Sequence, residues 1–143
     1  MTTQSPHRSI SLARDSAGRF TATNARGGTL SFGSGADDDF TPVELLLTAI
    51  AGCSAIDVDI LTTRRSEPAT FTVTAEGDKL RDDQGNHMGP ITVTFDVTFP
   101  EGEEGDAART VLPDAARQSH ERLCTVTRTV LLPTDVTTTV VPH

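Results

Sequence analysis

Hydrophobic and polar residues alternate strictly along two stretches in the middle of the chain. Phe71, Val73 and Ala75 share one face of the first stretch, and alternate residues from Ile91 to Phe99 form the apolar face of the second. Alternation with a period of two is typical of half-buried strands. The polar stretch "RDDQGNHMGP" between them predicts that the two strands pair as an antiparallel hairpin.

The longest apolar run, "TPVELLLTAIAGCSAIDVDI", predicts a helix whose first helical residue is Pro42 and which ends near Arg64 and Arg65. Thr41 suits the N-cap, Pro42 suits the first helical position, and Glu44 falls three residues after the cap. Together these residues make a capping box. Because no charge lies between Glu44 and Asp57, the helix is apolar on all sides, and we expect most of those sides to be buried.

The remaining segments complete an α+β order. Short strands are expected on either side of the turn Asp15–Gly18, and a third in "GGTLSFGSG". A second helix is expected over roughly 106–123, with a kink or a late start near Asp114 because Pro113 interrupts it. The acidic stretch "EGEEGD" is interpreted as a solvated loop and "TDVTTTVV" as a last strand. The order βββ-α-ββ-α-β indicates an α+β fold in a single domain, residues 1–143.

Composition and charge exclude several classes of partner. The chain has 143 residues and a formal net charge of -8, which argues against nucleic acid, whose phosphates demand a basic surface. No apolar run is expected to span a bilayer, and "MTTQSPHRSI" lacks the apolar core of a signal peptide. We therefore expect a cytoplasmic protein without a membrane partner. Since the only aromatic residues are six Phe, part of the apolar burial is expected to come from a partner chain.

The chain has two cysteines, Cys53 in the middle of the long helix and Cys124 far along the chain. In a reducing cytoplasm they fit reactive or merely buried thiols better than a permanent disulfide. By residue type alone, Cys53 fits a small buried hydrophobe. Asp57 lies one turn later on the same face, and its charge disfavours a thiolate. A reactive Cys53 would therefore need a cation from elsewhere.

His120 and Cys124 are one helical turn apart. That spacing suits half of a metal site, or an imidazolium that lowers a thiol pKa. The alternative is a surface histidine at the end of a helix, where its charge suits the dipole. His7, His87 and His143 show no spacing that completes a metal site, so we predict neither a metal nor a cofactor.

Two motifs resemble those of the osmotically inducible protein C / organic hydroperoxide resistance (OsmC/Ohr) family. "TPVELLLTAIAGCSAIDVDIL" is similar to the central-helix motif. "SHERLCTVTRTV" is similar to the second motif, in which a serine, a charged pair and a cysteine are followed by a valine and a hydroxyl residue. The resemblance covers about residues 8–141. It implies an OsmC-like fold and an intertwined homodimer, in which antiparallel sheets wrap a long buried central helix.

The resemblance also implies a thiol-dependent peroxidase. Cys53 would be the peroxidatic cysteine, attacking the O–O bond of an organic or hydrogen peroxide to give a sulfenic acid. Cys124 would resolve it to a disulfide, which an external thiol then reduces. Active members of the family activate the cysteine with an arginine from the N-terminal strands. Arg19 is the candidate here, with Arg14 and Arg26 as alternatives.

The sequence departs from the family pattern at a glutamate that follows the helix-start proline. Val43 occupies that position, and Glu44 lies one residue later, on the opposite side of the helix from Cys53, where it serves the capping box. This departure and the charge of Asp57 motivate a second hypothesis, a binding module. It would hold a small apolar or electrophilic ligand in the dimer cleft around Cys53 without turnover. In a third hypothesis, both cysteines are inert residues of the hydrophobic core.

Overall fold

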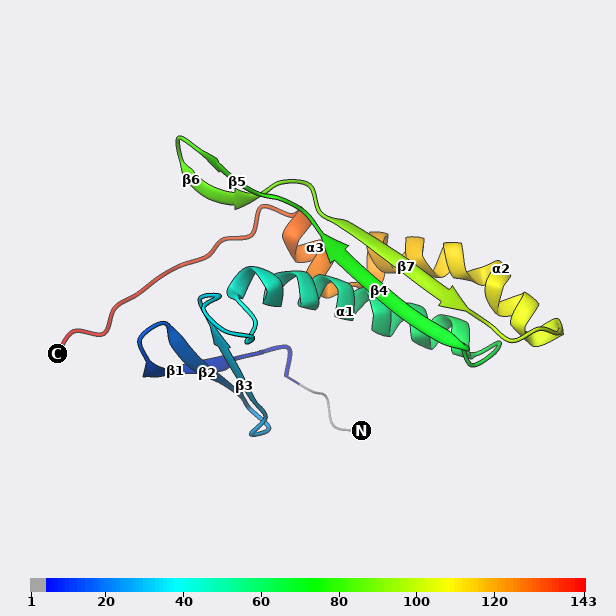
Figure 1. Ribbon diagram of the computed structural model, residues 1–143, viewed down its shortest axis with the longest axis horizontal. Coiled ribbons are helices and arrows are strands. Elements are labelled where there is room, and N and C mark those ends of the chain that lie inside the picture. The colour runs from blue at the N-terminus through cyan, green and yellow to red at the C-terminus, as the bar shows by residue number, and fades with distance from the viewer. Residues whose placement is uncertain (1–4) are drawn as a thin grey trace. The chain divides into compact units, whose positions relative to one another are not determined.

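The structure, a computed structural model, describes residues 5–143. Residues 1–4, which begin the stretch judged to lack a signal-peptide core, lie outside the described residues. The chain divides into two compact units, Met1–Leu46 and Leu47–His143. Helices and antiparallel strands are both present, so the predicted α+β class is confirmed (Figure 1).

The first unit contains a three-stranded antiparallel sheet in the order β1 (Ile10–Ser16), β2 (Arg19–Asn24) and β3 (Thr29–Gly33) (Figure 1). All three predicted strands are confirmed. The turn between β1 and β2 depends on Gly18, whose φ of 72° is a conformation that other residues rarely adopt. Phe20 and Phe32 are paired across β2 and β3, and their stacked rings lie 5.9 Å apart between centroids.

Helix α1 (Pro42–Thr63) begins at the predicted residue. The Thr41 N–H donates to Glu44 Oε1 at 2.9 Å, and the Glu44 N–H donates to Thr41 Oγ1 at 3.3 Å. The capping box is therefore confirmed. Hydrogen bonds from the backbone and then the side chain of Thr41 lower the pKa of the Glu44 carboxyl. These contacts explain Glu44 as a residue that starts the helix.

Within one chain, α1 is buried along a single stripe. Its buried residues repeat every four positions: Ile50, Ser54, Val58 and Thr62. On other sides Ile56 and Ile60 are 62% and 52% exposed, although they are as apolar as the buried stripe. Burial of those sides was expected against a partner subunit, and it stays a prediction.

α1 has the length and composition of a membrane span, with 22 residues and a mean hydropathy of 1.7 over its 18-residue window. The expectation that no apolar run could cross a bilayer is therefore wrong on these two criteria. The helix passes them because several of its solvent-facing positions carry leucine or isoleucine, namely Leu46, Ile56 and Ile60. Core helices of soluble proteins have the same composition, so length and hydropathy alone do not place α1 in a membrane.

In the second unit, β4 (Thr70–Glu76) and β7 (Thr92–Thr98) pair antiparallel, which confirms the predicted pairing. Their apolar residues are half-buried and the threonines between them are exposed. The stretch interpreted as a polar turn is more ordered than predicted. It forms a second two-stranded sheet, β5 (Lys79–Asp82) with β6 (Gly85–Met88), seen beyond the β4–β7 pair in Figure 1. The turn between them needs Gly85, whose φ is 129°.

Helix α2 (Glu103–Gln118) starts earlier than predicted. The acidic residues interpreted as a solvated loop form its first turn, where carboxylates suit the positive end of the helix dipole. Pro113 lies inside the helix, so a start near Asp114 is wrong. A surface hollow of about 340 Å³, lined by Leu61 of α1 and Ala115 of α2 among others, shows that these helices lie side by side.

The predicted final strand is wrong. α2 continues into one π-helical turn, η1 (Ser119–Leu123), and a short helix, α3 (Thr125–Leu131), follows it. Residues 132–143 form neither helix nor strand. Their alternation fits a strand, but no strand of the described chain pairs with them, and Val136 and Val140 are 88% and 87% exposed.

Candidate functional site

The two cysteines lie together in the second unit with one carboxylate. Cys53 Sγ, Cys124 Sγ and an Asp57 carboxylate oxygen all lie within 4.8 Å of one another. We call these three side chains the dithiol–carboxylate cluster. Both cysteines are free thiols; Cys124 is fully buried and Cys53 is half-buried. Cys53 and Asp57 share one face of α1, as their spacing predicted.

The π-helical turn η1 brings the third member of the cluster into place. The Cys124 N–H donates to the Ser119 carbonyl at 2.9 Å, which is the wider hydrogen bond of a π turn. At the start of the same turn, the buried Ser119 hydroxyl donates to Asp57 Oδ2 at 2.8 Å. One short segment therefore fixes the Asp57 carboxylate and places Cys124 beside it. Ser119 is the serine of the second motif, but no function was predicted for it, because its position in the sequence does not indicate a contact with Asp57.

Cys124 also caps helix α3. The Thr127 N–H donates to Cys124 Sγ at 3.3 Å, and the Thr127 hydroxyl lies 3.2 Å from the same sulfur. Burial raises the pKa of Cys124, but hydrogen bonds from Thr127, Cys53 and Ser54 to the ionised sulfur outweigh it. The pKa of Cys124 therefore lies below its ordinary value. Of the two cysteines, the fully buried Cys124 is the one whose thiolate the surrounding hydrogen bonds stabilise more.

The pKa of the Cys53 thiol moves in the opposite direction. Burial raises it most; the Val126 backbone N–H lowers it in part, and Cys124 and Asp57 raise it further. The predicted effect of Asp57 on this thiol is thereby confirmed, although desolvation is the larger cause.

Comparison with known proteins decides the family. The profile of OsmC-like proteins matches residues 35–139, which include both motifs. The chain belongs to the OsmC family. A search of curated proteins gave no match.

Solved structures with the same fold cover most of the OsmC-like chain. A hypothetical protein from Aquifex aeolicus VF5 has a TM-score of 0.70 at 22% identity, with 89% of each chain covered. An OsmC-like protein of unknown function from Vibrio cholerae O1 has a TM-score of 0.71 at 13% identity, with 87% of this chain and 94% of that one covered. The organic hydroperoxide resistance protein OhrB of Bacillus subtilis has a TM-score of 0.53 at 13% identity, covering 86% and 90%. At these identities the likeness shows the fold alone.

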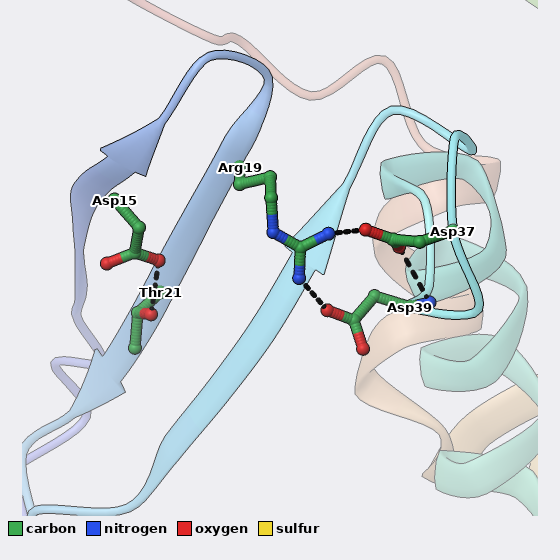
Figure 2. A network of polar contacts seen from close by, with 5 residues as sticks. All are labelled: Asp15, Arg19, Thr21, Asp37 and Asp39. Carbon is green, nitrogen blue, oxygen red and sulfur yellow. Dashed lines mark hydrogen bonds and ion pairs between the residues drawn. The ribbon is translucent and has the colours of Figure 1, made fainter.

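Two carboxylates from the loop before α1 hold Arg19, the candidate activator of the OsmC-like site. Its guanidinium pairs with Asp37, and with Asp39 at 2.5 Å between Nη2 and Oδ2. The Asp39 N–H donates to Asp37 Oδ1 at 3.0 Å, which closes a network within the first unit (Figure 2). The alternatives are exposed: Arg14 lies on β1, and Arg26 follows β2. The activating role of any of the three stays a prediction.

His120 is exposed on η1. Among the described residues, the possible metal ligands that gather around Cys124 are Cys53 and Asp57, not His120. The half-site suggested by the spacing of His120 and Cys124 is therefore not formed. The π turn changes the angle between those two residues from the one that an α-helical turn would give.

Proposed function

We propose that this OsmC-like protein reduces organic or hydrogen peroxides with its two cysteines. The observation that carries the proposal is the proximity of two reduced sulfurs, within 4.8 Å of each other, in a chain of this family. A pair so close needs little movement to form a disulfide. The hydroperoxide resistance in the name of the Bacillus subtilis relative agrees with this chemistry.

The reaction takes two electrons from the cysteine pair. The Cys53 thiolate attacks one peroxide oxygen, the O–O bond breaks, and the alkoxide leaves as an alcohol after it takes a proton. Cys53 is then a sulfenic acid. Cys124 attacks the Cys53 sulfur, an S–S bond forms, and the hydroxyl leaves as water. Two external thiol groups then reduce this disulfide by exchange and become a disulfide themselves.

Exposure and acidity support different roles for the two thiols. Cys53 is half-buried and is the sulfur that a peroxide can reach. Cys124 is fully buried, and its lowered pKa suits a thiol that attacks a neighbouring sulfenic acid. The raised pKa of Cys53 means that attack needs a nearby positive charge. We propose that Arg19 supplies it in a cytoplasmic homodimer whose chains each form one OsmC-like domain over residues 1–143.

The direct test oxidises the native protein once. One equivalent of cumene hydroperoxide is expected to remove two free thiols per chain and to produce an intrachain Cys53–Cys124 disulfide, found by peptide mapping without reductant. Cumyl alcohol, which lacks the O–O bond, is the matched control and should leave both thiols free. If the thiol count stays unchanged with the hydroperoxide, or no intrachain disulfide forms, the proposal is wrong.

The activating arginine is tested by substitution. Arg19→Met is expected to slow peroxide loss by on the order of 100-fold, the effect of removing one charge-stabilising donor from an active site. Arg14→Met and Arg26→Met are the matched controls and should react at the native rate. Single-turnover loss of cumene hydroperoxide is measured for each. A native rate in Arg19→Met would remove Arg19 from the mechanism.

One observation favours the second candidate, a binding module that holds a small apolar or electrophilic ligand without turnover. The pKa of Cys53 is raised by burial and by its neighbours, as expected for an unactivated thiol. The pH dependence of Cys53 alkylation in the assembled protein separates the two functions. A midpoint near or above about 8.5 supports binding, and a clearly lower midpoint supports catalysis.

A further inference from the structure

We infer that the dithiol–carboxylate cluster is also a binding site for a thiophilic divalent cation, with Zn²⁺ as the best fit. The ligands are Cys53 Sγ, Cys124 Sγ and one carboxylate oxygen of Asp57, which lie within 4.8 Å of one another. This inference goes beyond the proposed peroxide chemistry and does not depend on it. It rests on the donor atoms and on the residues that hold them.

The donor set suits zinc. Two thiolates and one carboxylate are ordinary zinc ligands, and zinc sites with three protein ligands take a water as the fourth. Bond lengths of about 2.3 Å to sulfur and about 2.0 Å to oxygen place the three ligand atoms about 3.5–3.8 Å apart around a tetrahedral ion. Because the three atoms already lie within 4.8 Å of one another, each pair needs to approach by no more than about 1.3 Å.

Hydrogen bonds hold the ligands in place as they do around established metal sites. The Ser119 hydroxyl donates to Asp57 Oδ2 at 2.8 Å, which orients the carboxylate beside the two sulfurs. The Thr127 N–H binds Cys124 Sγ at 3.3 Å. Cys53 and Asp57 are four residues apart on α1, the spacing by which a single helix presents two ligands to one ion.

The charge of the cluster also favours a cation. With both thiols ionised the three ligands carry a charge of about -3, and a divalent ion offsets most of it. Binding is a simple exchange in which each thiol gives up its proton and its sulfur bonds to the metal. No electrons move. Because the metal occupies both sulfurs, a zinc-bound cluster cannot form the Cys53–Cys124 disulfide, and metal and peroxide compete for the same pair.

The test measures metal binding without peroxide. The reduced full chain is titrated with Zn²⁺ against a chromophoric chelator, and with Cd²⁺ while the thiolate-to-metal ultraviolet band is followed. We expect one ion per chain and loss of the Cd²⁺ band in the Cys53→Ser/Cys124→Ser variant. Asp57→Asn should weaken Zn²⁺ binding at least about tenfold. Asp59→Asn, which removes an exposed carboxylate two residues further along α1, is the matched control and should bind as the native chain does.

Two results would overturn the inference: undiminished metal uptake by the double cysteine variant, or equal affinity in Asp57→Asn and Asp59→Asn. Circular dichroism establishes that each variant is folded. The native protein gives an independent measurement that needs no variant. Zn²⁺ should protect Cys53 from alkylation where the same concentration of Mg²⁺ does not, and absence of protection counts against the site. None of these measurements uses a peroxide. They therefore test zinc binding separately from the proposed peroxide reduction, and either hypothesis can fail while the other holds.

Discussion

Cys53→Ser is expected to abolish peroxide consumption, whereas Cys124→Ser is expected to consume one equivalent and stop at a sulfenic acid on Cys53. In the proposed mechanism, the first variant lacks the half-buried thiol that attacks the peroxide. The second lacks the buried thiol that, in the same mechanism, turns the sulfenic acid into a disulfide. These outcomes follow from the different exposure of two sulfurs that otherwise lie within 4.8 Å of each other.

Cys124→Ser should also make Cys53 more acidic. Burial is the largest cause of the raised Cys53 pKa, and it remains in this variant. The hydrogen bond to the Cys124 sulfur and the charge of that sulfur raise the pKa as well, and both disappear. The pH at which Cys53 begins to react therefore moves downward relative to the native chain.

Single-turnover loss of cumene hydroperoxide and mapping of dimedone adducts measure both effects. Dimedone should label Cys53 in Cys124→Ser and neither position in Cys53→Ser. Ser66→Ala, outside the dithiol–carboxylate cluster, is the control and should consume peroxide at the native rate. Labelling of Cys124 in Cys53→Ser would mean that Cys124, and not Cys53, attacks the peroxide. The lowered pKa of Cys124 favours that outcome, whereas its complete burial opposes it.

Gly105→Ala is expected to destabilise the protein by about 3 kcal/mol or more, at the upper end of the cost of overpacking. Gly105 is buried in the first turn of α2, and a Cβ there would lie 1.7 Å from the Pro100 carbonyl oxygen. That oxygen also accepts a hydrogen bond from the Arg109 guanidinium at 3.2 Å, which a shift of the carbonyl would lengthen. The expected sign is opposite to helix propensity, which favours Ala over Gly by about 1 kcal/mol.

Urea unfolding at a fixed protein concentration measures this loss as a lower midpoint. Gly102→Ala is the matched control in the same segment. A Cβ at Gly102 meets nothing within 4 Å, so its cost is backbone strain alone at a φ of 122° and a ψ of 177°, about 1–3 kcal/mol. A smaller loss for Gly105→Ala than for Gly102→Ala would show that the approach of α2 to Pro100 is not tight.

Local patterns were sufficient for the elements whose residues interact with near neighbours. The start of α1 was predictable because Thr41 and Glu44 satisfy each other's backbone within one turn. The β4–β7 pair was predictable because its apolar faces alternate without interruption. Each pattern is sufficient by itself to predict its element, and the structure confirms both elements.

Elements that depend on context were missed. The acidic residues from Glu103 to Asp106 suit a loop or a helix start equally, and only the chain that follows decides. The terminal valines alternate as in a strand, but a strand needs a partner, and none pairs with them in the described chain. Thr125 and Val126 are β-branched, yet they begin α3, because Cys124 caps it with a sulfur that sequence patterns do not treat as a cap.

The candidate site was predictable in part. Two motifs pointed to Cys53 and Cys124, and helical spacing placed Asp57 beside the first. Ser119 and its hydrogen bond to Asp57 join residues 62 positions apart through a π turn, which no spacing rule anticipates. The direction of the two thiol pKa values also depends on these contacts, and the sequence alone does not order them.

The exposed apolar side of α1 bears on how long a newly made chain survives in a cell. Ile56 and Ile60 lie in water on a single chain, so this side offers a binding surface to chaperones and a route to aggregation until something covers it. Unfolding measured on such a chain depends on protein concentration if the cover is a second copy. Chains at low concentration would then be degraded faster than chains at high concentration. Doubling the rate of synthesis would therefore more than double the steady-state amount of the protein.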